Sequence, residues 1–185
     1  MADDPYLSVP SVPHLPRTPG AGSVDKESFR HIAYFVSAHG FGHATRAAAV
    51  MAAVHALDPA ICFEVFTAAP EFLFRASLTG PFVYHHGLTD IGLVQRSALV
   101  EDPPATLARL DDFLPFDEFL LRSWADWLGR LECELVICDI APLGLAVAEL
   151  AGLPSVLIER SAGDWIYDSF GLDTQCVRRL ADTLR

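Results

Sequence analysis

Apolar and polar residues alternate along the chain in blocks that predict strands and helices in turn. Short apolar runs bounded by turn residues are typical of buried strands. They occur at residues 31–36, 61–66, 82–86, 134–139 and 155–158. Because helix-like segments separate most of these runs, the pattern predicts an α/β fold with a parallel sheet that helices cover on both faces.

The segment after the first run has apolar residues at helix spacing from Ala44 onward. We expect its buried face to consist of Ala47, Val50, Met51, Val54 and Leu57. A strand, a glycine-containing turn and a helix in that order form the first half of a Rossmann-like βα unit.

Proline and glycine positions locate the remaining helices. A short helix is predicted over 70–78, and a longer helical region over 105–131, which Pro115 splits or restarts. Residues 142–152 begin with proline and end with glycine, as helices commonly do, and 173–184 form a last amphipathic stretch.

Two further segments lack periodicity. Residues 1–29 hold five prolines and predict a disordered tail, which leaves residues 30–185 as one domain. Residues 87–104 predict a long loop of the kind that is often functional. Within the helical region, Trp124 and Trp127 fit a buried helix face better than a stacking platform for a ligand.

The composition indicates a folded domain and limits the classes of binding partner. Hydrophobic residues make up 51% of the 185 residues, which is enough for a real core. The net charge of -11 argues against nucleic acid or an anionic membrane as a general partner, although it leaves room for a local basic site.

The four cysteines show no CxxC pair and no zinc spacing. Cys62 and Cys138 lie inside predicted strands, where small buried thiols are expected. The acidic start is unlike a signal peptide, and no apolar run is long enough for a transmembrane segment. We therefore expect a cytoplasmic protein.

The turn after the first strand carries the candidate chemistry. Gly40 and Gly42 allow a sharp turn and leave room for a ligand, and the helix start behind them attracts negative charge. His39 and His43 can move protons near neutral pH. Their spacing would suit a metal only on a helix, which the glycines disfavour, so we expect no metal. Because Thr45 stands where a dinucleotide fingerprint has a third glycine, that fingerprint is incomplete.

Right-handed crossovers favour the strand order 3-2-1-4-5, counting the five predicted strands along the chain. The first and fourth strands are then neighbours, and ligands bind at their carboxyl ends. His43 follows the first strand and Asp139 ends the fourth, so we expect the two side chains to meet there. A carboxylate beside a histidine fixes the tautomer of the ring and stabilises the imidazolium, which makes a general base.

A purely structural role remains an alternative at each of these positions. His43 could cap the helix while Asp139 accepts hydrogen bonds from backbone amides. Arg46 either meets an anion or is solvated. At the end of the third predicted strand, either His85 or His86 reaches the crevice, or both are satisfied within the fold.

The turn resembles a known family. Residues 38–46, AHGFGHATR, resemble the first loop of GT-B glycosyltransferases of the MurG-like and UDP-glucuronosyl branches. They are more similar still to the HGFGHATR stretch of predicted bacterial glycosyltransferases and of the amino-terminal part of plant L-arabinokinase. Residues 135–144, 151–155 and 161–167 resemble later segments of the same fold.

This resemblance implies one half of a GT-B fold, the amino-terminal half that holds the acceptor. It implies that His43 is the base acting on an acceptor hydroxyl and that Asp139 orients it. The donor would be a nucleotide-sugar such as a UDP-sugar, used as co-substrate with no further cofactor, and the acceptor a small molecule or glycan. The residues implied in acceptor or ligand binding are His39, Gly40, Phe41, Gly42, Arg46, Glu159, Arg160, Asp164 and Trp165.

One departure from the family pattern concerns the donor. The chain shows no second βαβ series and no donor-binding motif. We expect a fragment, a chain completed by a separate donor domain or a second copy, or a domain without catalysis. A hexosyltransferase-type enzyme is the first hypothesis, and a non-catalytic sugar- or nucleotide-binding module is the alternative.

Overall fold

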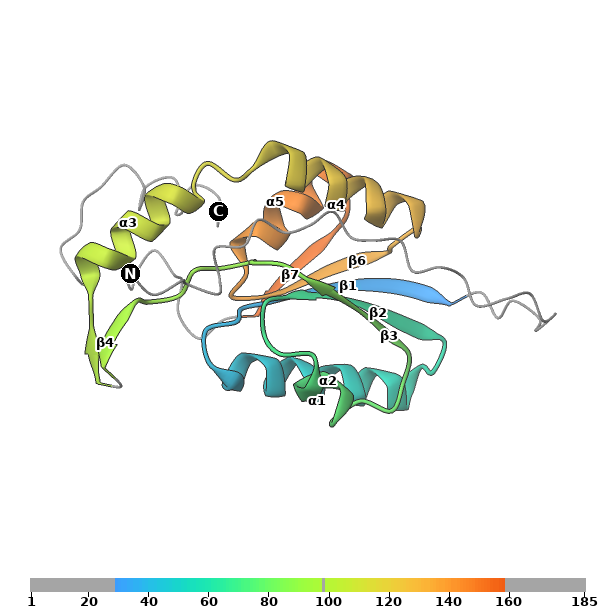
Figure 1. Cartoon of the computed structure of the whole chain (residues 1–185). Coiled ribbons are helices and arrows are strands. Elements are labelled where there is room, and N and C mark those ends of the chain that lie inside the picture. Colours follow the sequence, from blue (N-terminus) through green and yellow to red (C-terminus); the bar gives the residue numbers. More distant parts are fainter. Residues whose placement is uncertain (1–28, 98, 159–185) are drawn as a thin grey trace.

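A five-stranded parallel sheet forms the centre of the computed structural model, which describes residues 29–97 and 99–158. Its strands are β1 (Arg30–Val36), β2 (Ile61–Thr67), β3 (Phe82–His86), β6 (Leu135–Asp139) and β7 (Ser155–Ile158). Their spatial order is β3-β2-β1-β6-β7, and every pairing is parallel. The predicted order is therefore confirmed, with β1 beside β6 (Figure 1).

Helices cover both faces of this sheet, as predicted. Figure 1 shows α1 (Phe41–Leu57) and α2 (Phe72–Arg75) on one side, with α4 (Glu118–Arg130) and α5 (Pro142–Ala151) on the other. Alternate residues of β1 pack against the helices on opposite faces of the sheet, because successive strand side chains point to opposite faces. Tyr34 packs with α1, whereas Phe35 packs beneath α4 and α5.

Aromatic rings fill the second layer. Phe35 stacks on Phe66 with ring centroids 4.5 Å apart, and Trp124 lies 5.6 Å from Phe35. The interpretation of Trp124 as a core residue is confirmed. Gly144 allows α5 to approach closely, since a Cβ there would lie 2.6 Å from the Phe35 ring.

The buried face of α1 differs from the prediction. The helix begins at Phe41 instead of Ala44, and Leu57 is 87% exposed. Leu57 follows Met51 by six residues, or about 240° around the helix, so it points away from the face that Met51 buries. The buried residues of this helix are Ala44, Ala47, Ala48, Met51 and His55.

The segment predicted as a loop over 87–104 is partly structured. It contains an antiparallel pair, β4 (Gln95–Ser97) and β5 (Val100–Glu101), and it runs into α3 (Pro103–Phe113). The short strands are exposed, so no apolar pattern marked them. Pro115 separates α3 from α4, as predicted, after a cis Leu114–Pro115 peptide.

Other predictions have mixed outcomes. The short helix predicted over 70–78 is reduced to the four residues of α2. Cys62 and Cys138 are buried free thiols, as predicted. Within the described ranges, no helix is long and apolar enough to cross a bilayer. The tail over 1–28 and the stretch over 173–184 lie outside the described residues.

Candidate active site

The candidate site lies at the carboxyl edge of the sheet, where β1 and β6 end side by side. Val36 and Asp139 are register partners on these strands. The backbone N–H of Ser37 donates to the Asp139 carbonyl at 3.0 Å, so the turn leaves the sheet directly beside that residue. The topology thus brings together residues that lie about a hundred positions apart.

Gly40 shapes the turn into α1. Its φ of 81° and ψ of 159° are accessible to glycine and costly for other residues, and no side chain caps the helix. The first backbone N–H groups of α1 therefore receive no side-chain acceptor from the capping position. A Cβ at Gly40 or Gly42 would have no neighbour within 4 Å, so the space before the turn is open.

His43 and Asp139 meet, as the strand order predicts. His43 Nδ1 lies 2.8 Å from Asp139 Oδ1, and the two side chains are 23% and 0% exposed. We assign the Nδ1 proton to this contact, because the carboxylate is an acceptor. The alternative in which His43 caps the helix is wrong, since α1 has no side-chain cap. Nε2 is then left as the proton-accepting atom of the ring.

Of the two expectations for Arg46, the structure bears out the contact with an anion, and that anion is the Asp139 carboxylate within the fold. Its Nε donates to Asp139 Oδ2 at 2.8 Å, and its Nη2 donates to Oδ1 at 2.5 Å. Burial alone would raise the pKa of Asp139, but the hydrogen bonds from His43 and Arg46 outweigh burial and lower it. Asp139 is therefore an ionised carboxylate with two partners.

A cavity of about 590 Å³ adjoins the turn that leads into α1. It is lined by Ala38, His39, Gly40, Leu88, Asp90, Ile91, Leu93, Val94, Gln95 and Arg109. Leu88 and residues 90–95 of this lining belong to the segment after β3, which therefore forms one wall of the cavity. Its volume lies within the range of small-molecule sites.

Two hydrogen bonds fasten this segment to the end of β1. Ser37 Oγ donates to Asp90 Oδ2 at 2.6 Å, and Thr89 Oγ1 donates to the Val36 carbonyl at 2.7 Å. Gly92 has a φ of 57° and lies directly against the His39 ring, where a Cβ would not fit. The cavity wall is therefore fixed to the end of β1 and to the turn that leads to His43 in α1.

The structure separates the predicted site residues into three groups. His43 and Arg46 meet Asp139, whereas His39 and Gly40 line the cavity. Phe41 and Gly42 are exposed at the start of α1. Glu159, Arg160, Asp164 and Trp165 lie outside the described residues.

The histidine pair that ends β3 takes no part in this site. His85 is buried and contacts Glu64, with Nε2 2.5 Å from Oε2, so it is satisfied within the fold. His86 is exposed. Tyr34 was not predicted as a site residue, yet its hydroxyl is buried and lies near enough for the Asp139 charge to raise its pKa, after burial as the larger cause.

Comparison with known proteins gives matches to parts of larger proteins. No family model matches the chain. L-arabinokinase of Arabidopsis thaliana is 32% identical over 148 residues, which cover 77% of this chain and 14% of that protein. CalG4, the calicheamicin glycosyltransferase, matches with a TM-score of 0.52 at 18% identity, over 84% of this chain and 42% of that structure. A UGT transferase from Siraitia grosvenorii in complex with UDP gives a TM-score of 0.48 at 18% identity, over 78% of this chain and 33% of that one.

The matches to L-arabinokinase and CalG4 agree with the resemblance seen in the turn. The similarity to L-arabinokinase extends that resemblance over most of the chain. The structural match to CalG4 concerns the fold alone at this identity, and it confirms the expected fold class. The chain spans less than half the length of each of these proteins.

Proposed function

This chain has the Rossmann-like fold of one half of a GT-B glycosyltransferase, and on that basis we propose that it binds an acceptor and supplies its general base. The observation that carries the proposal is the contact of 2.8 Å between His43 Nδ1 and Asp139 Oδ1. This contact lies at the carboxyl edge of the parallel sheet, between β1 and β6, where the strand order changes direction. Open parallel sheets bind ligands at such a point.

The reaction we propose is transfer of a sugar from a nucleotide-sugar donor to a hydroxyl. His43 Nε2 takes the proton as the acceptor oxygen attacks the anomeric carbon. The bond from that carbon to the nucleotide breaks, and the nucleotide leaves with the electron pair. Asp139 holds the ring in the required tautomer and stabilises the imidazolium that forms.

The cavity beside the turn is the proposed acceptor site. Its wall combines apolar residues such as Ile91 and Leu93 with the polar groups of His39 and Asp90. This mixture suits an acceptor with an apolar body and hydroxyl groups. The donor, for which a UDP-sugar is our first choice, would be held by a second half or a partner chain.

A complementation assay tests this proposal. The chain is combined with the donor half of a longer glycosyltransferase, and sugar transfer from a labelled UDP-sugar to a panel of hydroxyl acceptors is measured. We expect transfer to depend on this chain and to fall about 100-fold or more in His43→Gln. The matched control is His86→Gln, which changes an exposed histidine of β3 and should leave transfer unchanged.

One observation favours binding without catalysis as a second candidate. Arg46 already neutralises the Asp139 carboxylate through two hydrogen bonds, so the carboxylate has less charge to offer an imidazolium. Calorimetry on the chain separates the two functions. Micromolar binding of a sugar or nucleotide, without transfer in the complemented assay, supports a binding module.

A further inference from the structure

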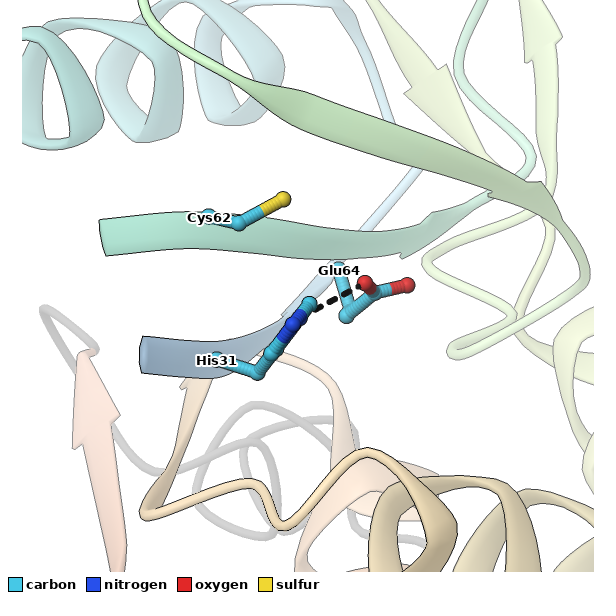
Figure 2. Close-up of side chains that lie close together, drawn as sticks. All are labelled: His31, Cys62 and Glu64. Carbon is cyan, nitrogen blue, oxygen red and sulfur yellow. Dashed lines mark hydrogen bonds and ion pairs between the residues drawn. The ribbon is translucent and has the colours of Figure 1, made fainter. Parts of the chain in front are cut away.

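A second cluster of polar side chains lies away from the proposed site. His31 of β1 stands beside Cys62 of β2 in the strand register, and Glu64 follows two residues later on β2 (Figure 2). All three belong to the face that α4 covers, because they alternate with Ile32, Phe63 and their neighbours on the α1 face.

The ligand atoms of this cluster are close together. His31 Nδ1 lies 3.0 Å from Glu64 Oε1, a contact that Figure 2 marks. One ligand atom of each of the three side chains, the Cys62 sulfur among them, lies within 4.8 Å of the others. Among residues 29–97 and 99–158, His31, Cys62 and Glu64 form the group of three His, Cys, Asp or Glu side chains that could hold a metal ion.

Burial makes the cluster unusual. All seven residues of β2 are buried, and Glu64 is 1% exposed in the middle of that strand. A carboxylate taken out of water at the centre of a sheet is costly unless a positive charge or several donors face it. His85 provides one contact, with Nε2 2.5 Å from Oε2, and His31 provides another, with Nδ1 3.0 Å from Oε1.

We propose that His31, Cys62 and Glu64 bind a divalent transition metal, and that zinc is the ion this set of nitrogen, sulfur and oxygen donors favours. Tetrahedral zinc with bonds of about 2.0–2.2 Å places nitrogen and oxygen ligands about 3.3 Å apart. The observed 3.0 Å between His31 and Glu64 needs only a small adjustment. A thiolate and a carboxylate neutralise the ion, so the buried cluster carries no net charge.

The surroundings supply what a metal site needs beyond its ligands. His85 contacts the second oxygen of Glu64, which orients the carboxylate as outer partners of metal ligands do. The His31 side chain is 21% exposed and gives an ion access from solvent. A water molecule from that side would take the fourth position.

Metal binding would release a proton. A bound zinc ion deprotonates a coordinating thiol, and the proton passes to solvent. Zinc competes with protons for the Cys62 thiolate and the His31 ring, so affinity should rise with pH.

The position indicates a structural role that does not depend on the proposed function. His31 lies five residues before Val36, so the cluster is about 16 Å along β1 from the edge that holds Asp139. An ion here would join β1 to β2 from one face. If the metal proposal fails, the proposal that His43 is a general base still stands. If the His43 proposal fails, the metal proposal still stands.

Metal titration of the untagged full chain tests the proposal. After treatment with a chelator, zinc affinity is measured by competition with a chromophoric chelator, and cobalt is added to a second sample. We expect one ion per chain and a sulfur-to-cobalt charge-transfer band. In Cys62→Ala the band should vanish and zinc affinity should fall by about 10–100-fold or more. Glu64→Gln and His31→Gln should weaken binding in the same direction.

Cys138→Ala is the matched control, because it removes a second buried thiol from a neighbouring strand and should leave metal binding unchanged. Circular dichroism checks that each variant folds. The cobalt spectrum of the unaltered chain tests for a sulfur ligand even where a variant fails to fold. Binding below one ion per chain, or equal zinc affinity in the unaltered chain and Cys62→Ala, overturns the proposal. An equal loss in Cys138→Ala also overturns it.

Discussion

Arg46 and His43 share one carboxylate, because both project from the first turns of α1 toward Asp139. They are three residues apart and so lie on the same face of the helix. Arg46 Nη2 also lies 3.3 Å from His43 Nδ1, which packs the three groups into one unit. The fold of the turn and the chemistry we propose therefore depend on the same contacts.

Removing the guanidinium should destabilise the protein. In Arg46→Ala, the fully buried Asp139 side chain loses two charge-assisted hydrogen bonds, so we expect the free energy of unfolding to fall by about 2 kcal/mol. Urea denaturation measures the change. The control is Arg122→Ala, whose partner Glu118 lies 3.5 Å away with both side chains exposed, and a change within about 0.5 kcal/mol is expected there. Equal effects in both variants would contradict the account.

Asp139→Asn should destabilise the chain in a pH-dependent way. Since the folded-state pKa of Asp139 is lowered, the ionised group contributes stability above its unfolded pKa of about 3.9. That contribution is lost as the pH falls through the folded pKa. Unfolding measured from about pH 7 down to about pH 3 should show the variant less stable at neutral pH, with the difference shrinking in acid. A difference that stays constant with pH would count against this role.

Asp90→Asn should change the pH dependence of stability in the opposite direction to Asp139→Asn. Burial raises the pKa of Asp90 more than the Ser37 hydroxyl and the Gly92 backbone N–H lower it. The folded state therefore binds the proton more tightly, and stability is lost as the pH rises through the folded pKa. Asparagine removes the charge and keeps one side-chain oxygen as an acceptor, so the stability of the variant relative to the parent should rise from acid to neutral pH. A relative stability that falls from acid to neutral pH would refute this assignment.

The sequence predicts the topology well because alternating strands and helices leave few allowed connections. Once β1 and β6 are neighbours, the ends of both strands must lie at one edge, and His43 must approach Asp139. The exposed face of α1 was harder to predict. Alanines dominate this helix, so its apolar residues do not distinguish the buried side from the exposed one, and Leu57 was misplaced.

Polar contacts between distant residues were the main features missed. Arg46 has only neutral or apolar neighbours in the sequence, and nothing local shows that Asp139 accepts its hydrogen bonds. Glu64 offered a signal, because a carboxylate inside the apolar run ICFEVF needs a partner. Which histidines supply that partner follows only from strand register, which the sequence pattern does not specify.

Close packing of α5 against the sheet can be tested at Gly144. In Gly144→Ala the new Cβ would lie 2.6 Å from Phe35 and 2.7 Å from the Cys138 sulfur, so we expect a loss of about 1–3 kcal/mol. Gly129→Ala is the control on α4, where a Cβ meets nothing within 4 Å and should add up to about 1 kcal/mol. Thermal unfolding compares the two, and a neutral Gly144→Ala would show that the helix can shift.

Chemical rescue in the complemented transfer assay tests the central claim most directly. His43→Ala removes the proposed proton acceptor and leaves space for a small base beside Asp139. We expect sugar transfer to fall by about 100-fold or more and to recover in part when free imidazole is added, with a rate that rises with imidazole concentration. Transfer in His43→Ala at the parental rate would contradict the claim that this histidine accepts the proton.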